Sequence, residues 1–572
     1  MNVGVDTGGT FTDAVTDAGG TVKVPSTSED PAVAVRAAVD TFAATPGVLA
    51  HGTTVATNAL LERSGAPVAL VTTAGFSDII EIGRQNRPSL YDLWADRPDS
   101  LVPRSLRFEA GTEATLPGDV RSVAVCLLHS DRDPAAERAA AEALSRQGLD
   151  VTCSADVSPE YREYERTLTT VINAYLRPSC RAYLSRLAPL ADEVLVMTSA
   201  GGLVPLADAA ELPAALLLSG PAGGVLAAAA VAAANGSPDA ITFDMGGTST
   251  DVCLVRRTLP EAAPGRIVGG FPVRLPSLDV HTIGAGGGSV ARVDAGGALV
   301  VGPQSAGARP GPACYGHGGT APTVTDADLV LGRIPSGTVL PGLGPLDSAS
   351  ARAALDRAGV TAEGVVRVVN ANMERALRAV SVERGVDPRA LALVAFGGAG
   401  PLHACELADA LGMPRVIVPA RAGVLSALGV LGAPRSRELV RSWAGDGSID
   451  AAARALADEA ARLVGSSAVT ETFFDVRYSG QSHEITVRSL DEFHDEHRRR
   501  NGYSRADAPL EVVALRARAR TDSPLDITSL PPVDRSTPVG PAVIAEPDCT
   551  IWLPDGWAGR RGEADALVLE RR

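Results

Sequence analysis

The chain has 572 residues, of which 45% are hydrophobic, 21% charged and 4% aromatic. This composition is typical of a well-packed α/β protein and excludes a disordered chain, and the length predicts three or four domains. The formal net charge of -15 and the isoelectric point near 5.1 exclude a surface built for nucleic acid or anionic membranes, so we expect small-molecule chemistry or protein partners.

The seven cysteines are scattered and show no CxxC spacing. Neither a disulfide framework nor a zinc site is therefore predicted, and a reducing, cytoplasmic location is expected. The first strand is predicted to begin at once, without the basic and apolar regions of a signal peptide. The most apolar window, Pro213 to Ala234, is interrupted by Gly and Pro, so no membrane span is expected.

Strands and helices are predicted to alternate through the first part of the chain. Val3 to Val15 is expected to form a β-hairpin, because two short apolar runs flank a glycine turn. The alternation that follows indicates a mostly parallel, layered sheet. Helices are expected at Pro31–Phe42, Ala59–Arg63 and Pro134–Arg146, and strands at Val68–Thr72 and Val123–Leu128.

A second α/β segment is predicted from about Glu163. Its long first helix, Glu165–Leu187, is expected to kink or break at Pro178. Dense Gly and Pro from Gly284 to Gly319 predict mainly loops. The other elements expected here are strands at Val194–Met197, Ala240–Phe243 and Leu391–Phe396, and helices at Val365–Arg384 and Pro401–Leu411.

The pattern changes beyond about Arg435. A helix is expected at Ile449–Leu463, followed by runs of alternating apolar and polar residues. These runs predict a small β-rich C-terminal domain. They cover Phe473–Val487, Glu511–Arg520 and Ala542–Leu553.

One glycine-rich sequence occurs twice, as "VGVDTGGTFTDAV" at Val3–Val15 and as "ITFDMGGTSTDVC" at Ile241–Cys253. Because glycine has no Cβ, the backbone N–H groups of such a turn can face a bound anion such as phosphate. An Asp suits Mg²⁺ or its water ligands instead. The residues expected to line the site are Asp6, Gly8, Gly9, Thr10 and Thr12 in the first copy, and Asp244, Gly246, Gly247, Thr248, Ser249 and Thr250 in the second.

A single copy has an ordinary glycine hairpin as an equally good interpretation. Two copies at matching offsets favour a duplicated domain whose hairpins face each other across a cleft and grip a nucleoside triphosphate, with Mg²⁺ between Asp6 and Asp244.

A third glycine turn, "FGGAG" at Phe396–Gly400, follows a predicted strand and opens a helix. Its glycines Gly397, Gly398 and Gly400 would let the backbone approach adenine and ribose. Together the three turns predict a duplicated α/β fold of the actin, sugar-kinase and heat-shock-chaperone ATPase type, with a small β-rich C-terminal domain and with ATP and Mg²⁺ as cofactors.

Longer stretches carry a resemblance to a known family. They are "DTGGTFTD" (Asp6–Asp13), "HGTTVATNALLERSGAPVALVTTAGFSDIIEIGRQNRPSLYDL" (His51–Leu93), "REYERTLTTVINAYLRP" (Arg162–Pro178), "LSGPAGG" (Leu218–Gly224), "FDMGGTSTDV" (Phe243–Val252), "LDVHTIGAGGGSVARVDAGGAL" (Leu278–Leu299), "GPQSAGARPGPACYGHGGTAPTVTDADLVLGR" (Gly302–Arg333) and "FGGAGPLHACELA" (Phe396–Ala408). In these stretches the chain resembles the ATP-dependent hydantoinase A / 5-oxoprolinase family, which includes the smaller subunits of N-methylhydantoinases and related acetone carboxylases.

The resemblance implies three domains: an N-terminal hydantoinase/oxoprolinase domain at 1–160, a hydantoinase A domain at 161–435 and the β-rich domain at 436–572. It also implies an enzyme that uses ATP to phosphorylate a cyclic amide, such as hydantoin, 5-oxoproline or another lactam, for ring opening. Asp6 and Asp244 would hold the metal, and Asp13 or Asp251 would orient the nucleophile. A separate, larger hydantoinase B-type subunit with its own metal site is implied as partner, which makes a hetero-oligomer.

Several alternatives stay open. The family's frequent "QSNGG" is replaced by "TSAGG" at Thr198–Gly202, which leaves the substrate undefined. An ATP-dependent ketone carboxylase subunit and a nucleotide-gated scaffold without turnover are the other functions to consider. His51 is as well explained by a structural role as by contact with substrate or phosphate, and Cys314 is better explained as a buried loop residue than as a nucleophile.

Overall fold

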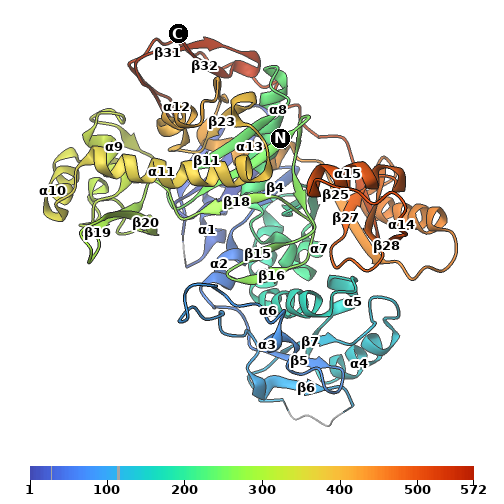
Figure 1. Cartoon of the computed structure of the whole chain (residues 1–572). Helices are drawn as coiled ribbons and strands as arrows, with labels where there is room; N and C mark the ends of the chain where they lie inside the picture. The colour runs from blue at the N-terminus through green and yellow to red at the C-terminus, as the bar shows by residue number, and fades with distance from the viewer. Residues whose placement is uncertain (28, 112–115) are drawn as a thin grey trace.

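Two mixed sheets with the same strand order form the centre of the molecule (Figure 1). The computed structural model describes residues 1–27, 29–111 and 116–572. The first sheet has the order β10-β9-β4-β1-β2-β3, and the second has the order β13-β12-β11-β23-β24-β32-β31, with β18 also paired to β12. In each sheet an antiparallel hairpin, β1–β2 or β11–β12, continues through its first strand into two parallel strands.

The strands of the first sheet are β1 (Asn2–Thr7), β2 (Phe11–Thr16), β3 (Thr21–Pro25), β4 (Val48–Gly52), β9 (Glu193–Met197) and β10 (Leu203–Pro205). Those of the second are β11 (Ala240–Met245), β12 (Thr250–Arg256), β13 (Leu259–Pro260), β18 (Val280–Ile283), β23 (Ala392–Phe396), β24 (Arg415–Val418), β31 (Trp557–Arg561) and β32 (Leu567–Arg571). The predicted mixed α/β fold is confirmed, and the repeated strand order shows that its two central sheets are copies of one topology.

Two glycine-containing helices pack against each other between the sheets. A Cβ on Gly429 of α13 (Leu425–Gly432) would lie only 1.9 Å from the carbonyl oxygen of Gly223 in α8 (Gly220–Ala234), so this close approach requires glycine. A Cβ on Gly4 of β1 would lie 2.3 Å from the carbonyl oxygen of Ala427, which places α13 directly on the first sheet. The α8–α13 pair therefore joins the two sheets.

A four-stranded parallel sheet lies beyond the first central sheet, with the order β6-β5-β7-β8. The long helix α6 (Glu163–Leu187) packs against it and continues through Pro178, so the expected break is wrong. Ala66 N–H donates to the carbonyl oxygen of Tyr175, next to the carbonyl that Pro178 leaves without its helical donor. Burial along α6 offsets the remaining cost of the proline. The other elements here are β5 (Val68–Thr72), β6 (Arg107–Glu109), β7 (Ser122–Cys126), β8 (Asp150–Cys153), α3 (Ile79–Ile82), α4 (Ala135–Ser145) and α5 (Ser154–Val157).

The segment from Gly284 to Gly319 contains more regular structure than its glycine content predicts. β19 (Ser289–Val293) and β20 (Leu299–Ser305) pair as an antiparallel hairpin, and the rest of the segment is mainly loops, as expected. The alternating apolar residues on either side of Asp294 carried the strand signal, and the helix α11 (Ala362–Val380) covers β20.

The C-terminal residues belong to two different sheets. β25 (Ser436–Ser442), β28 (Leu510–Arg520), β26 (Val469–Tyr478) and β27 (Ile485–Val487) form a separate sheet in that order, covered by α14 (Ile449–Val464) and α15 (Phe493–Asn501). The last two strands, β31 and β32, instead return to the second central sheet, where β32 pairs with β24. Strand pairing therefore crosses the expected boundary at 435, and the pairing of β4 with β9 crosses the one at 160.

A buried network of charges joins the C-terminal sheet to the start of α6. Arg516 Nε on β28 lies 2.8 Å from Asp475 Oδ2 on β26, and its Nη2 lies 3.3 Å from Glu160 Oε2. Arg274 bridges Glu160 at 2.5 Å and Glu484 at 3.0 Å. Burial would raise the pKa of Glu484, but Arg162 and Arg274 lower it to about 2. These ion pairs hold the C-terminal sheet on the body of the protein.

Three of the remaining helices, α1 (Pro31–Asp40), α7 (Leu206–Glu211) and α12 (Gly400–Leu411), pack against the two central sheets. α2 (Val55–Leu61) packs on α6, and α9 (Val324–Val330) and α10 (Ser348–Ala358) pack beside β19. Short two- and three-residue strands complete the fold, among them β15 (Arg266–Val268), β16 (Phe271–Val273) and β21 (Val339–Leu340), together with the hairpin of β29 (Ala542–Ala545) and β30 (Thr550–Leu553). Within the described residues, no helix is both long and apolar enough to cross a lipid bilayer.

Candidate functional site

The two glycine hairpins meet tip to tip. A Cβ on Gly9 would lie 3.5 Å from the side chain of Thr248, and a Cβ on Gly247 would lie 2.5 Å from Thr10 Oγ1. The first hairpin thus contacts the second across the boundary between the two central sheets. The structure brings together the glycine and threonine residues that the sequence singled out at the two turns.

Some of the N–H and hydroxyl groups that were predicted to bind phosphate already make hydrogen bonds within the protein. The N–H groups of Gly8 and Gly246 close their own turns, by donating to the carbonyl oxygens of Phe11 at 3.0 Å and Ser249 at 3.1 Å. Thr12 lies one step below the tip, where its hydroxyl shares a 3.1 Å hydrogen bond with Ser26. Thr250 donates to the carbonyl oxygen of Ala285, so its hydroxyl is also engaged.

Each hairpin carries two aspartates opposite each other. Asp6 on β1 faces Asp13 on β2, and Asp244 on β11 faces Asp251 on β12. Burial, helped by the charges of Asp251 and Asp6, raises the pKa of Asp244 to about 8. Burial and the charge of Asp13 raise the pKa of Asp6 to about 7, and burial raises the pKa of Asp251 to about 6.

These carboxylates fit a divalent cation. Asp6 Oδ1 is buried and has no hydrogen-bond partner among the described residues. A Cβ on Gly52 or Gly220 would lie only 2.6 Å or 3.2 Å from this oxygen, so glycine leaves the space around it open. Buried carboxylate oxygens that repel one another are the hard ligands Mg²⁺ prefers, and a cation would relieve their repulsion.

Lys23 is one of the site residues that the sequence analysis did not predict. It lies on β3 opposite Asp13, and its Nζ lies 2.6 Å from Asp13 Oδ1 and 3.2 Å from the carbonyl oxygen of Gly423. Burial raises the pKa of Asp13, and the charge of Lys23 opposes that rise. The sequence could have drawn attention to this residue, because Lys23 is the only lysine among the 52 Lys and Arg residues of the chain.

Other missed residues support the second hairpin. Ser426 Oγ donates to Asp244 Oδ2 at 3.3 Å, and Thr282 Oγ1 donates to Asp251 Oδ1 at 2.5 Å. The N–H groups of Gly287 and Gly288 donate to the carbonyl oxygens of Gly246 and Gly247. These partners come from distant parts of the chain, so the local sequence of the hairpin carries no sign of them.

The third glycine turn abuts the carboxylates. Gly397 has a φ of +77°, and a Cβ there would lie 2.3 Å from Asp244 Oδ1. Ala399 N–H donates to the carbonyl oxygen of Met245 at 3.0 Å, and α12 begins at Gly400. The turn therefore lies against the end of β11.

Replacing Gly397 with alanine should displace Asp244 and weaken nucleotide binding. A left-handed alanine costs about 1–2 kcal/mol, and the added methyl group overlaps the carboxylate. Gly398→Ala is the matched control, because a Cβ at Gly398 meets no atom within 4 Å. Isothermal titration of ATP into both variants checks this, and equal affinities would contradict it.

His51 and Cys314 have structural environments. His51 is buried, its Nε2 lies 2.7 Å from Tyr183 Oη, and burial lowers its pKa to about 4. Cys314 is buried, and burial with the charge of Asp326 raises the pKa of its thiol. Both residues fit the structural interpretation better than a chemical role.

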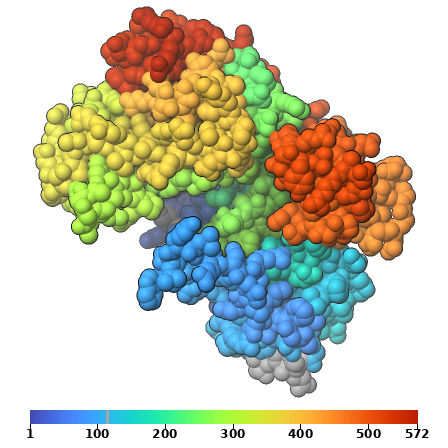
Figure 2. All heavy atoms as spheres, in the orientation of Figure 1, coloured from blue at the N-terminus to red at the C-terminus, as the bar shows by residue number. Residues whose placement is uncertain are grey.

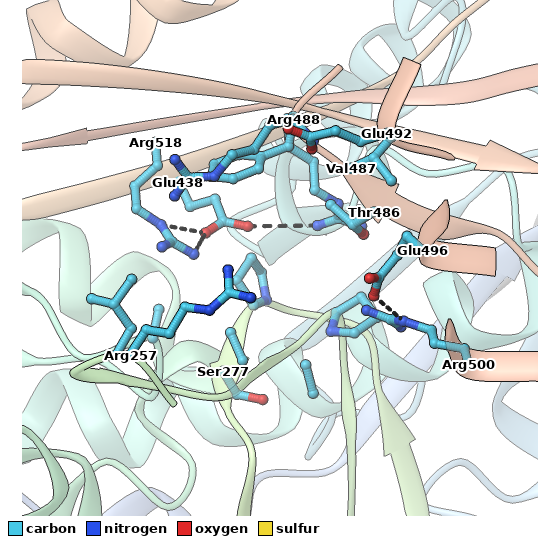
Figure 3. A pocket seen from close by; sticks show the side chains of 18 of the residues that line it. Arg257, Ser277, Glu438, Thr486, Val487, Arg488, Glu492, Glu496, Arg500 and Arg518 are labelled. Atoms are coloured by element: carbon cyan, nitrogen blue, oxygen red, sulfur yellow. Dashed lines mark hydrogen bonds and ion pairs between the residues drawn. The ribbon is translucent and has the colours of Figure 1, made fainter. Parts of the chain in front are cut away.

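A charged cavity of about 930 Å³ lies elsewhere, between the C-terminal sheet and the segment 257–277 (Figure 3). Its guanidinium groups are largely paired with acids, as Arg518 is with Glu438 at 2.7 Å and Arg500 with Glu496 at 2.6 Å. None of the predicted site residues lines it. The candidate nucleotide site is therefore separate from this cavity.

The site and the fold together define a two-sheet α/β protein with paired glycine hairpins around buried carboxylates. The hydantoinase/oxoprolinase family model matches residues 166–438, and the model of the hydantoinase/oxoprolinase N-terminal region matches residues 2–120. Caprolactamase subunit alpha of Pseudomonas jessenii is 33% identical over 97% of this chain and 97% of that protein. The chain therefore belongs to the hydantoinase/oxoprolinase family.

A solved structure and two further relatives are also similar to this chain, and their names describe three different activities. The crystal structure of ATP-dependent caprolactamase from Pseudomonas jessenii matches with a TM-score of 0.81 and 29% identity over 100% of both chains. The acetophenone carboxylase gamma subunit of Aromatoleum aromaticum is 32% identical over 75% of this chain and 67% of that protein. 5-Oxoprolinase 1 of Arabidopsis thaliana is 34% identical over 66% of this chain, which matches only 35% of that longer protein.

Proposed function

We propose that this chain is the ATP-hydrolysing subunit of a hydantoinase/oxoprolinase-type amidohydrolase that activates a cyclic amide, such as a hydantoin, 5-oxoproline or another lactam, for ring opening. The observation that carries the proposal is the meeting of two glycine hairpins beside four aspartates, of which Asp251 is buried and the other three are partly buried. The repeated strand order supports the finer assignment to the actin and sugar-kinase type of ATPase fold. The name of the caprolactamase relative supports the substrate class.

The aspartates have distinct roles in this proposal. Asp6 and Asp244 would hold Mg²⁺, since burial and the charges of neighbouring aspartates raise the pKa of each, to about 7 and about 8. The tip residues Gly9, Thr10, Gly247 and Thr248 would cradle the phosphates of ATP, which supplies the phosphoryl group that turns an unreactive amide oxygen into a leaving group. Asp251 suits proton transfer better than Asp13, because Asp13 is held in the ion pair with Lys23.

The thermal stability of the metal-free protein should fall as pH rises. The pKa of Asp244 is about 8 in the folded state, against an ordinary value of 3.8, so between these two values the folded state holds a proton that the unfolded chain has released. Stability is therefore lost with rising pH across that window, and a bound cation restores it at the alkaline end. Asp6, Asp13 and Asp251 act in the same direction, and the charge of Lys23 only reduces the contribution of Asp13.

The measurement is the melting temperature across pH with and without Mg²⁺. We expect Mg²⁺ to raise Tm by at least about 3 °C near the alkaline end and to have little effect at the acid end. The double variant Asp6→Asn, Asp244→Asn should lose the Mg²⁺ response and most of the slope, since Asp251 remains. A wild-type profile that is flat with pH and unaffected by Mg²⁺ would remove the cation from the proposal.

Replacing Lys23 with arginine should impair turnover. Its ammonium fits between Asp13, the Gly423 carbonyl and the ring of Phe11, whereas a guanidinium is larger and planar. We expect Lys23→Arg to reduce kcat by about 10²-fold, with Tm close to that of the wild type because the ion pair to Asp13 is kept. Steady-state phosphate release checks this, and full turnover by the arginine variant would show that only the charge matters.

The proposed function is tested by phosphate release in the presence of the hydantoinase B-type subunit from the same genome. Stimulation by members of a lactam and hydantoin panel, together with ring-opened product, supports the amidohydrolase. Stimulation by ketones with bicarbonate supports the alternative of a ketone carboxylase, which the acetophenone carboxylase relative favours. ATP turnover that responds to neither substrate class supports a nucleotide-gated scaffold.

A further inference from the structure

An unusual cluster of apolar side chains projects from the loop that follows α3. Leu90, Tyr91, Leu93 and Trp94 are 75% to 96% exposed, all within five consecutive residues. Aromatic side chains alone present about 150–250 Å² each, so these four expose roughly 500 Å² of apolar surface. A patch of about this size is among the largest that a monomeric protein exposes, and such patches are often functional.

The loop that carries this cluster is held at its base. Arg97 donates to the carbonyl oxygens of Ile82 at 3.0 Å and Asn86 at 2.6 Å, which closes the segment. At the tip, Ser89 Oγ accepts from the N–H of Asp92 at 3.1 Å, and Asp92 Oδ1 accepts from the N–H of Trp94 at 2.9 Å. The exposed side chains therefore project from a fixed base, which lowers the ordering cost of docking.

The apolar surface continues onto neighbouring elements. Gly270, in the turn between β15 and β16, lies against Pro98, since a Cβ there would be 2.5 Å from its ring. Gly269 lies against Leu61 of α2, and both Leu61 and Ile267 are largely exposed. Figure 2 shows that the blue lobe of this loop borders a recess, with the yellow-green lobe of β19 and β20 on the other side.

We propose that the loop 88–98 is the docking surface for a second, separately encoded subunit, the hydantoinase B-type chain, which receives Tyr91 and Trp94 in an apolar pocket. Tyr and Trp are the side chains that dominate protein interfaces, and a stable interface needs roughly 800 Å² from each partner, most of which this surface supplies. This assignment rests on the proposed function for the identity of the partner.

Two observations favour this partner over a second copy of the chain. Each copy carries a net charge of -15, so self-association brings together two strongly acidic surfaces, and Asp92 lies in the middle of the tip. Two relatives are named as subunits, the caprolactamase subunit alpha and the acetophenone carboxylase gamma subunit. A different chain with an apolar pocket is therefore the occupant to which the surface is suited.

The test compares association of the full chain and its variants with the purified hydantoinase B-type subunit from the same genome. The variant Tyr91→Ser, Trp94→Ser should raise Kd by at least about 30-fold, because each is a hot-spot side chain. The matched control is Val339→Ser, an apolar residue 65% exposed between α9 and α10. Circular dichroism melting should be unchanged in all variants, because the replaced side chains contact little of the protein.

Trp94 supplies a second readout. It is one of four tryptophans, and in the free chain it is almost fully exposed. Binding of the subunit should protect it from acrylamide quenching, and Trp94→Phe should remove that change. The assignment is overturned if the wild-type chains do not associate, if the double variant binds with unchanged Kd, or if the chain alone forms an oligomer that the double variant dissociates.

The outcomes separate this assignment from the proposed function. Association is measured without nucleotide, and ATP hydrolysis is measured on the resulting complex. A complex that forms through Tyr91 and Trp94 but hydrolyses no ATP leaves the docking surface in place and removes the ATPase proposal. If lactams stimulate ATP hydrolysis and the double variant still binds the subunit with unchanged Kd, the ATPase proposal stands and the docking surface is removed.

Discussion

Replacing Asp244 with alanine should reduce ATP turnover by at least about 10³-fold while leaving the fold intact. Asp244 is the penultimate residue of β11 and lies beside Gly397 and Ser426, and the charge of Asp6 on the opposite hairpin helps to raise its pKa. Removing it takes away half of the proposed cation site. Burial disfavours the charge of Asp244, and its removal leaves only the Ser426 hydroxyl without its acceptor, so Tm in the absence of metal should change little.

The measurement is phosphate release under saturating ATP, together with Tm and the affinity for ATP. Asp239→Ala is the matched control, because Asp239 precedes the other end of the same strand and accepts a hydrogen bond from the N–H of Arg257. That variant should keep its turnover. Retention of more than about a tenth of the wild-type rate by Asp244→Ala would remove this residue from the reaction.

Replacing Arg516 with methionine should destabilise the protein by about 3–5 kcal/mol. The guanidinium is buried between Asp475 and Glu160, and methionine would leave these acids buried without its charge. The C-terminal sheet should separate from the start of α6 first, because this network joins them. Urea unfolding followed by circular dichroism gives the change, and limited proteolysis locates it.

Arg520 is the control for that experiment. It lies on the same strand as Arg516, but its side chain is half exposed and its ion pair to Glu471 is long, at 3.8 Å. Arg520→Met should change the stability by no more than about 0.5 kcal/mol. Equal effects of the two substitutions would show that the buried network contributes nothing beyond surface charge.

The elements around the site were predictable because their signals are local. Strand Val68–Thr72 was predicted to the residue, and the two hairpins and the turn at Phe396–Gly400 were found from glycine patterns of a few residues. The repetition of one pattern also indicated the duplicated topology, since equal sequences at strand ends fold alike. The roles of the site residues in binding and chemistry stay predictions.

The parts that sequence reasoning missed depend on distant partners. The position of Lys23 beside Asp13 requires the pairing of β3 with β2, and β3 is a five-residue strand whose local sequence does not give its register. The pairing of β32 with β24 joins residues about 150 positions apart, so no local window contains it. The helix α6 continues through Pro178 because burial along the helix outweighs the tendency of proline to break it. The sequence shows that tendency correctly but not the burial.

If the hairpins bind ATP as proposed, the contact between their tips would control how fast the nucleotide enters. Thr10 and Thr248 each lie against a glycine of the opposite hairpin, so phosphates could enter between the tips only if the two central sheets moved apart, with the α8–α13 contact as the hinge. The observed association rate of ATP should then level off at high ATP concentration, at the rate of this opening. Replacing Gly223 or Gly429 with alanine would force α8 and α13 apart, and it should change this limiting association rate more than the rate of the chemical step.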